Sequence, residues 1–231
     1  MSGVRDRWRE VRGSLSPPSA KLIEREIGDA ASVLDVGCGA DSPLASFGGK
    51  YELTVGVDAH EPALARSRAA GKHDEYVLLD VRRIAERFQP GSFDAVIAID
   101  VLEHMDEAEG LDLLESMERI ARRRVVVFTP NGFVQQGETN GSPWQAHRSG
   151  WSTGCLRELG FRVYGVHGVR GLRGELSEPR WRPRRAWKLV SDLTQPVALR
   201  LPALAFQLLC VKEIRHSGPV SLGERARIAA L

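Results

Sequence analysis

The stretch VLDVGCGADSPLASFGG, residues 33–49, decides the fold class that we expect for this chain. An aliphatic run ends in two closely spaced glycines, Gly37 and Gly39, and Asp35 stands two positions before the first of them. A glycine-rich turn after a strand lets the backbone approach a ligand closely, and such turns usually hold a nucleotide. The sequence therefore predicts a nucleotide-binding α/β domain, and the question is which nucleotide it holds.

Short aliphatic runs alternate with helical patterns around this stretch. This alternation is typical of βαβ units and of a mostly parallel sheet. We expect strands over 32–37, 51–59, 74–81, within 90–105 and over 123–130, with helices over 16–30, 43–49, 61–71, 82–88 and 106–121. Beyond residue 130 the pattern changes to a long loop over 130–149, a helix over 149–160, a strand over 161–168, a basic and apolar segment over 178–204 and a last strand over 205–214.

The composition favours one globular domain. The chain has 231 residues, of which 42% are hydrophobic and 27% charged, values near the globular average that exclude a disordered chain. The net charge of +2 gives little support to a nucleic acid as partner. We predict a single domain over 1–215, with a cofactor half over 17–130 and an acceptor loop and C-terminal half over 130–215, followed by a loosely ordered tail over 216–231.

The cysteines and the N-terminus predict a cytoplasmic location. Cys38, Cys155 and Cys210 are far apart and lack CxxC spacing, which is typical of reduced thiols and not of disulfides or a zinc site. The N-terminal residues are charged and include no apolar run, so no signal peptide is expected. No stretch reaches about 18 uninterrupted apolar residues, so no spanning helix is expected either.

Two kinds of nucleotide compete for the glycine turn. A dinucleotide requires G-x-G-x-x-G with an acidic residue roughly 20 positions later, and Asp58 lies at that distance. However, the third glycine would fall at Ser42, and the carboxylate of Asp35 would repel a pyrophosphate. Further acidic residues, Asp80 and Asp100, close the third and fourth predicted strands. A cationic ligand without phosphate accounts for these features better than NAD does.

S-adenosylmethionine is such a ligand, because its ammonium, ribose hydroxyls and adenine amine all donate hydrogen bonds to carboxylates. Here the chain resembles the class I S-adenosylmethionine-dependent methyltransferases, of the small-molecule, methyltransferase type 11-like kind. VLDVGCG, VGVDA, LLDV and FDAVIAIDVLEHM are similar to four motifs of that family, in the same order over about residues 32–130. The resemblance implies a Rossmann-like, doubly wound and mostly parallel seven-stranded sheet, with helices on both faces and an antiparallel last strand.

The resemblance also implies roles for the residues at the strand ends. Those assigned to the cofactor are Asp35, Gly37, Cys38, Gly39 and Asp41 in the turn for the methionine part, Asp58 and Ala59 at the ribose, Asp80 and Val81 at the adenine, and Asp100 facing the methyl group. Simpler roles stay open: Asp58 and Asp80 as helix caps, Asp100 as a loop residue and Cys38 as a small buried side chain. The family commonly has glycine where this chain has Asp41, and either Asp41 or Ser42 is suited to cap the helix that Pro43 begins.

Methyl transfer to oxygen or nitrogen is an in-line displacement, and a hydroxyl acceptor also needs a base. The candidates for catalysis are His147 in the long loop, His104 in DVLEHM, and Asp100. For each histidine the alternative is a structural role in packing or in holding the loop. Candidate substrate contacts are Asn131, Gln135, Trp144 and His147, while Trp144 and Trp151 either wall the pocket or anchor the loop. No HxxxH or HxH spacing is present, so no metal is expected.

The acceptor is a small molecule in this interpretation. DVLEHM stands where DNA amino-methyltransferases have a PP-aromatic motif, which argues against nucleic acid. The segment RWRPRRAWK, residues 180–188, is followed by apolar residues, so residues 180–205 form either a surface helix over the sheet or a weak membrane contact. Two alternative functions remain: a peripheral membrane enzyme acting on a lipid- or glycan-linked substrate, and a non-catalytic regulator that binds S-adenosylmethionine. The sequence predicts no particular oligomeric state.

Overall fold

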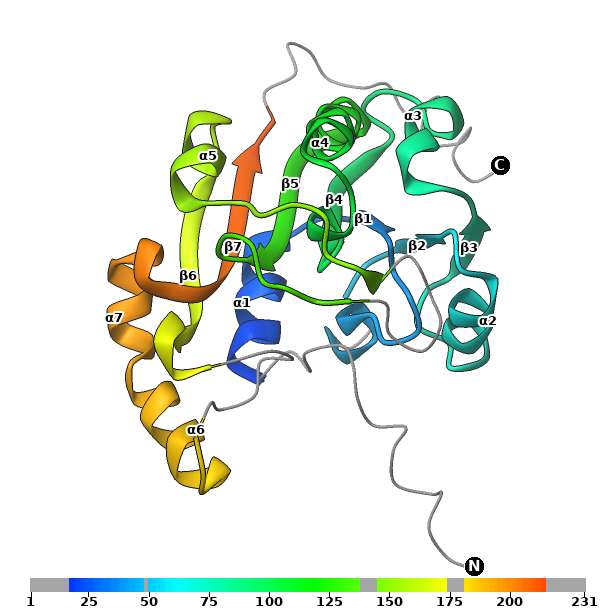
Figure 1. Cartoon of the computed structure of the whole chain (residues 1–231). Coiled ribbons are helices and arrows are strands. Elements are labelled where there is room, and N and C mark those ends of the chain that lie inside the picture. Colours follow the sequence, from blue (N-terminus) through cyan, green and yellow to red (C-terminus); the bar gives the residue numbers. More distant parts are fainter. Residues whose placement is uncertain (1–16, 48–49, 138–144, 174–180, 215–231) are drawn as a thin grey trace, which may run out of the picture.

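A single seven-stranded sheet runs through the chain (Figure 1). The computed structural model describes residues 17–47, 50–137, 145–173 and 181–214, so the predicted tail over 216–231 lies outside the described residues. The strands are β1 (Ser32–Val36), β2 (Leu53–Asp58), β3 (Glu75–Leu78), β4 (Phe93–Ile99), β5 (Ala121–Pro130), β6 (Arg162–Val169) and β7 (Ala205–Glu213). Their order across the sheet is β3-β2-β1-β4-β5-β7-β6.

The sheet confirms the predicted fold class. Strands β1 to β5 pair in parallel, whereas β7 is antiparallel to both of its neighbours, β5 and β6. In this register Asp35 lies opposite Gly56 of β2 and Ile97 of β4. The order reverses at β1, which has β2 on one side and β4 on the other. In open α/β sheets ligands bind beyond the carboxyl ends of the strands at such a reversal.

Helices cover both faces of the sheet. They are α1 (Pro17–Ile27), α2 (Glu61–Ala69), α3 (Ile84–Arg87), α4 (Glu107–Ile120), α5 (Thr153–Glu158), α6 (Arg184–Leu193) and α7 (Gln195–Arg200), with short 3-10 helices η1 (Pro43–Phe47), η2 (Val81–Arg83), η3 (Leu102–His104), η5 (Arg170–Leu172) and η7 (Pro202–Leu204). Successive strand residues point to opposite faces, so Val33 packs with α1 and Leu34 packs with α4.

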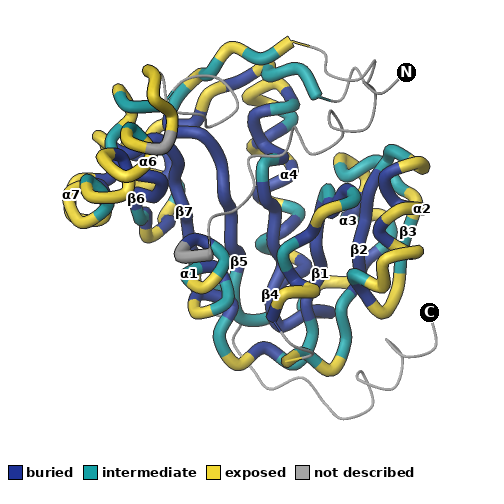
Figure 2. Tube along the Cα trace, turned by 90° about the horizontal axis from the view of Figure 1, so that it is seen from below, coloured by how far each residue is buried: buried dark blue, intermediate teal, exposed yellow. Residues whose placement is uncertain are grey.

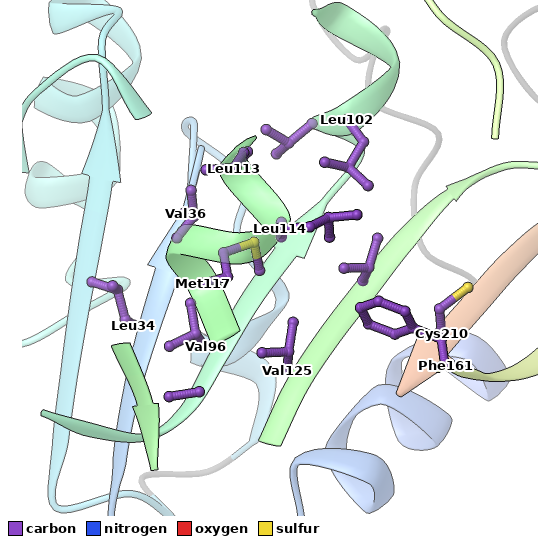
Figure 3. Packing of buried hydrophobic residues seen from close by; sticks show 14 of the residues in the cluster. Leu34, Val36, Val96, Leu102, Leu113, Leu114, Met117, Val125, Phe161 and Cys210 are labelled. Carbon is purple, nitrogen blue, oxygen red and sulfur yellow. The ribbon is translucent and has the colours of Figure 1, made fainter. Parts of the chain in front are cut away.

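The core lies around the central strands. All seven residues of β4 are buried, as expected for a strand that is covered on both faces. Figure 3 shows α4 packing Leu113, Leu114 and Met117 against Leu34 and Val96 of the sheet. In Figure 2 the central strands are dark blue, and exposed residues gather at the two ends of the sheet. This rigid centre fixes the positions of the strand ends that form the site.

Several helices are shorter than the sequence predicts. The segment 82–88 divides into η2 and α3, and the helix expected over 43–49 is the 3-10 helix η1. The helix expected over 149–160 begins only at Thr153, because Trp151 pairs with Asn131 in an isolated parallel bridge. Ser152 then caps α5 by accepting a hydrogen bond from the backbone N–H of Cys155. Tertiary pairing at residue 151 therefore overrides the local helical pattern.

Candidate functional site

A pocket opens at the carboxyl ends of the central strands. Asp58 and Ala59 reach it after β2, Asp80, Val81 and Arg82 after β3, and Asp100 and Val101 after β4. Its remaining lining residues include Gly37, His104, Glu109, Gln145 and Arg148. Three of the aspartates that the sequence singled out therefore meet around one pocket. The other two, Asp35 and Asp41, are not part of its lining.

Asp58 braces the glycine turn. One carboxylate oxygen accepts a hydrogen bond from the backbone N–H of Gly39 at 2.7 Å, and the other accepts from His60 N–H at 2.7 Å. Helix α2 begins after His60 without any side-chain cap, so Asp58 does not cap that helix. The carboxylate of Asp58 thus ties the turn after β1 to the end of β2 and still lines the pocket.

Asp35 supports the turn from beneath. Its Oδ2 accepts hydrogen bonds from Ser42 Oγ at 2.5 Å and from His73 Nε2 at 2.9 Å, and both Asp35 and His73 are buried. Ser42 Oγ in turn accepts from the N–H of Leu44 at 3.3 Å, so Ser42, and not the exposed Asp41, caps η1. His73 lies far from the glycine motif in sequence, and no local pattern pointed to it.

The turn after β1 requires glycine at two positions. Gly37 and Gly39 have φ values of 69° and 53°, which side chains rarely adopt. A Cβ on Gly37 would also lie 2.6 Å from Cγ2 of Val101. Gly56, opposite Asp35 on β2, leaves space for two buried side chains, since a Cβ there would lie 2.8 Å from His73 Nδ1 and 2.9 Å from Cys38 Sγ. Cys38 is therefore a small buried residue of the turn.

Asp80 takes the capping role that was left open for it. Its carboxylate accepts from the N–H of Arg82 at 3.0 Å and caps η2. The same carboxylate pairs with the guanidinium of Arg82, which lowers the pKa of Asp80. Arg82 also donates to Glu109 at the start of α4, at 2.8 Å. An ion-pair network therefore joins the end of β3 to α4 along the rim of the pocket.

Asp100 is half-buried, in a strained conformation, and lies near a buried acid, Glu103. Its φ is 52°, and its Oδ1 accepts a hydrogen bond from Gln207 Nε2 at 3.2 Å. Glu103 is fully buried and accepts from Thr129 Oγ1 at 3.0 Å. Burial, and then the nearby charge of Asp100, raise the pKa of Glu103 well above its usual range. Burial therefore favours the protonated form of Glu103, and sequence reasoning missed this residue.

Gln207 connects Asp100 to a buried histidine. The side-chain oxygen of Gln207 accepts a hydrogen bond from Nδ1 of His167, whose φ is 63°. Burial lowers the pKa of His167 to about 4, so its ring is neutral. Its Nε2 has no hydrogen-bond partner among the described residues. Neither His167 nor Gln207 was expected from the sequence, because their relation to Asp100 depends on how β6 and β7 pair.

His104 and His147 meet at the edge of the pocket. Their ring centroids lie 5.0 Å apart in an edge-to-face arrangement, and only His104 belongs to the pocket lining. His147 Nδ1 lies 2.6 Å from the carbonyl oxygen of Val134, so Nδ1 carries the hydrogen and Nε2 the lone pair. Burial lowers the pKa of His147. His104 Nδ1 lies 3.3 Å from the carbonyl oxygen of Ala146.

The same two histidines approach Glu103. One candidate ligand atom from each of Glu103, His104 and His147 lies within 4.8 Å of the other two. The sequence search considered only short spacings such as HxxxH, and the 43-residue separation of His104 from His147 escaped it. The structure thus brings together a set of groups that the sequence placed apart.

Asn131 and Gln135, two other proposed substrate contacts, lie outside the pocket lining. Asn131 is buried, and its amide donates to the carbonyl oxygens of Pro202, Ala203 and Ala205, so it anchors the end of β5 to η7. Gln135 is exposed and does not line the pocket. Trp144 lies outside the described residues.

Trp151 anchors the loop. It is buried and donates from Nε1 to Ser149 Oγ at 3.0 Å, which is the anchoring role that was left open for it. Arg148 in the same loop pairs with Asp106 at 2.6 Å and with Glu109 at 3.5 Å. The loop is therefore anchored directly after His147.

The chain is similar to known methyltransferases over part of its length. Residues 34–129 match a family model described as a methyltransferase domain. The chain is 30% identical over 122 residues to the ubiquinone biosynthesis O-methyltransferase of Idiomarina loihiensis, covering 48% of this chain and 50% of the relative. It is also 30% identical over 108 residues to the enzyme of the same name from Thiobacillus denitrificans, covering 45% and 40%. The chain thus spans about half the length, or less, of these curated relatives.

A solved structure extends the likeness to most of the fold. The crystal structure of a SAM-dependent methyltransferase from Archaeoglobus fulgidus has a TM-score of 0.53 and 16% identity, and the alignment covers 84% of this chain and 92% of that one. At that level of identity the similarity concerns the fold. The described residues contain no helix that is long and apolar enough to cross a membrane.

Proposed function

We propose that this chain, whose residues 34–129 match a family model described as a methyltransferase domain, transfers a methyl group from S-adenosylmethionine to a hydroxyl of a small molecule. The observation that carries the proposal is the pocket at the strand ends, where Asp58, Asp80 and Asp100 converge. This set of carboxylates suits a cationic ligand whose outer groups donate hydrogen bonds, and it would repel a pyrophosphate.

In this proposal each strand end binds one part of the cofactor. Asp58, already fixed by Gly39 and His60, accepts from the ribose hydroxyls, and its bracing keeps the carboxylate in place before the ligand arrives. Asp80 and Val81 hold the adenine. Asp35 acts indirectly by fixing the turn that receives the methionine part, because its side chain faces Ser42 and His73.

The chemistry proposed for the site is an in-line displacement. When bound, S-adenosylmethionine supplies a methyl group activated by its sulfonium. An oxygen–carbon bond to the acceptor forms as the sulfur–carbon bond breaks, and the hydroxyl proton passes to a base. His147 suits the role of this base for two reasons. Val134 fixes its tautomer, and the lowered pKa of its ring keeps Nε2 unprotonated at neutral pH. The name of the curated relatives, O-methyltransferase, supports an oxygen acceptor.

We propose that no metal ion takes part. Glu103 is the carboxyl group that lies with His104 and His147, and its burial beside Asp100 raises its pKa well above the usual range. A protonated carboxyl is a poor metal ligand, because metal binding requires the deprotonated form. The proposed role of the two histidines is therefore proton transfer and packing.

Calorimetric titration with S-adenosylmethionine tests the cofactor assignment. We expect the wild-type chain to bind it and Asp58→Ala to bind at least about tenfold more weakly, a loss of about 1.4 kcal/mol. Glu61→Ala is the matched control, because Glu61 is an exposed acid three positions later that lies outside the pocket lining. Asp58→Asn, which keeps an acceptor oxygen, should lie between wild type and Asp58→Ala.

Three results would contradict this assignment. Absence of binding at millimolar S-adenosylmethionine would exclude the proposed function. Binding of NAD in its place would favour a dehydrogenase. Equal affinity of wild type and Asp58→Ala would remove Asp58 from the cofactor site.

Transfer from labelled S-adenosylmethionine to a panel of phenols tests the base. With any phenol that the wild type methylates, we expect His147→Gln to lower kcat/KM by about 100-fold or more while cofactor affinity stays within about threefold. Because burial lowers the pKa of His147, the acidic limb of the wild-type pH profile should have its midpoint below about 6.5.

His104→Gln serves as the paired variant in the same assay. Loss of transfer in His104→Gln with full activity in His147→Gln would assign the base to His104. Loss of activity in the presence of a chelator would refute the metal-free proposal. Binding of S-adenosylmethionine with no transfer to any acceptor would favour the regulatory alternative.

A further inference from the structure

The second half of the chain carries an unusual amount of exposed apolar surface. Of the eleven large hydrophobic residues that are exposed in the described chain, eight lie between residues 181 and 204. They are Trp181, Leu189, Val190, Leu193, Val197, Leu199, Leu201 and Leu204. Scattered exposed apolar residues need no explanation, but a contiguous set marks an interaction surface.

The exposed hydrophobic residues of helices α6 and α7 point away from the body of the protein. Ser191 and Ala198 are fully buried and face the body, where α6 and α7 pack on β6. Leu189 and Leu193 each lie two positions from Ser191, which corresponds to about 200° around a helix, so they point outward. Their exposed fractions are 61% and 71%. Figures 1 and 2 show both helices on the outside of the sheet, at its β6 end.

Cationic residues flank this outward face. Residues 181–204 include five arginines and lysines but only one acidic residue, Asp192. Asp192 is paired with Arg173 at 3.1 Å and with Lys188 at 3.0 Å. Arg182 and Arg184 are exposed at the start of α6. The aromatic rings of Trp181 and Trp187 lie 4.8 Å apart at the same end.

From this surface we propose that α6 and α7 dock on an anionic lipid bilayer, with the outward leucines at the acyl boundary and the cations at the headgroups. An amphipathic helix with a basic flank and aromatic residues is the chemistry that binds such an interface. An anionic bilayer fits this face because residues 181–204 carry five basic residues and only one acidic residue, Asp192. The proposal does not depend on the methyltransferase activity.

Co-sedimentation of the full chain with vesicles tests the proposal. We expect strong binding to phosphatidylcholine vesicles that contain about one-third phosphatidylglycerol, and at least tenfold weaker binding to phosphatidylcholine alone. Raising NaCl from about 0.1 M to about 1 M shortens the Debye length from about 10 Å to about 3 Å, so binding should fall. Leu189→Ser/Leu193→Ser and Arg184→Glu/Lys188→Glu should each reduce binding to anionic vesicles at least tenfold.

The control is Leu78→Ser/Leu111→Ser, which removes two exposed leucines elsewhere on the molecule and should bind as the wild type does. Far-ultraviolet circular dichroism and S-adenosylmethionine titration check that the variants are folded. Absence of vesicle binding, or equal binding by wild type and Leu189→Ser/Leu193→Ser, would overturn the proposal. A concentration-dependent dimer that Leu189→Ser/Leu193→Ser abolishes, without vesicle binding, would assign the face to a second copy and overturn it as well.

Discussion

Two buried carboxyl groups near the pocket are in opposite situations. Asp35 accepts hydrogen bonds at one oxygen from both Ser42 and His73. Glu103 is buried with the charge of Asp100 nearby, and both raise its pKa. The sequence pointed to Asp35 because it belongs to a glycine motif. Glu103 was missed because EH in DVLEHM gives no sign of its burial.

Replacing Glu103 by its neutral isostere tests this protonation at the residue scale. The pKa of Glu103 is higher in the folded chain than the roughly 4.3 of the unfolded one, so its contribution to stability is fully present below about pH 4 and is lost as pH rises toward the folded pKa. Gln does not titrate. We therefore compare the free energy of unfolding of Glu103→Gln with that of the wild type. The difference, variant minus wild type, should increase by at least about 1 kcal/mol from about pH 4.5 to about pH 7.

Urea denaturation at several pH values measures this difference. Glu115→Gln on α4 is the control, because Glu115 is exposed and its substitution should give a pH-independent difference. A constant or shrinking difference for Glu103→Gln would mean that Glu103 is ionised in the folded protein.

At the scale of elements, α4 packs closely against the loop that carries His147, at Gly110 and Trp151. Gly110 of α4 lies under the ring of Trp151, and a Cβ there would approach Trp151 Cζ2 to 2.4 Å. Trp151 cannot easily move, since it is buried, bonded to Ser149 and paired through its backbone with Asn131. Glycine inside a helix usually costs stability, and here it makes room for the anchor of the loop.

Gly110→Ala should destabilise the protein for this reason. Alanine gains about 1 kcal/mol of helix propensity, but we expect overpacking against Trp151 to outweigh it and to leave a net loss of about 1–3 kcal/mol. Gly154→Ala in α5 is a matched control, because its Cβ would meet only Ser152 Oγ at 3.8 Å. Thermal unfolding of the two variants measures the contrast. Equal or higher stability of Gly110→Ala would show that Trp151 moves aside at little cost.

Ion pairs along the rim of the pocket connect several elements of the fold. Arg82 after β3 and Arg148 in the acceptor loop both pair with Glu109 at the start of α4. Each pair is partly exposed and contributes little stability alone. Together they place the end of β3, the first turn of α4 and the loop beside His147 in one arrangement around the pocket.

At the scale of the molecule, stability should vary across the sheet. The central strands β1 and β4 are buried, whereas β3 lies at an edge and has no buried residue. Native-state hydrogen exchange should therefore find the slowest amides in β1, β4 and β5, exchanging only through global unfolding, and faster exchange in β3. The other edge strand, β6, is covered by α6 and α7 and should be intermediate. Amides of β3 that exchange as slowly as those of β4 would contradict this order.

The membrane-docking face and the pocket are linked through the body of the molecule. Ser191 of α6 donates to the carbonyl oxygen of His167 at 3.2 Å, and His167 leads through Gln207 to Asp100. This chain of contacts crosses β6 and β7, which stand last in the sequence, and β7 lies between β5 and β6 in the sheet.

The sequence by itself determined the sheet and the strand-end aspartates. Aliphatic runs, glycine turns and the acid that closes each parallel strand are local patterns, and parallel strands bring their carboxyl ends to one edge whatever the loops do. Asp58, Asp80 and Asp100 therefore met around one pocket as expected. The same local patterns placed the glycine turn, whereas the antiparallel last strand was expected from the family resemblance alone.

Only the tertiary structure decided which polar groups face one another beneath and beside that pocket. His73 reaches Asp35 across 38 residues, Gln207 reaches Asp100 across 107, and Asn131 turns to η7 instead of the pocket. Such contacts depend on strand order, on register and on the burial that shifts a pKa, and none of these leaves a periodic trace in the sequence. The glycine turn after β1 pointed to the pocket at the strand ends, and the long-range packing around that pocket decides how its side chains are oriented.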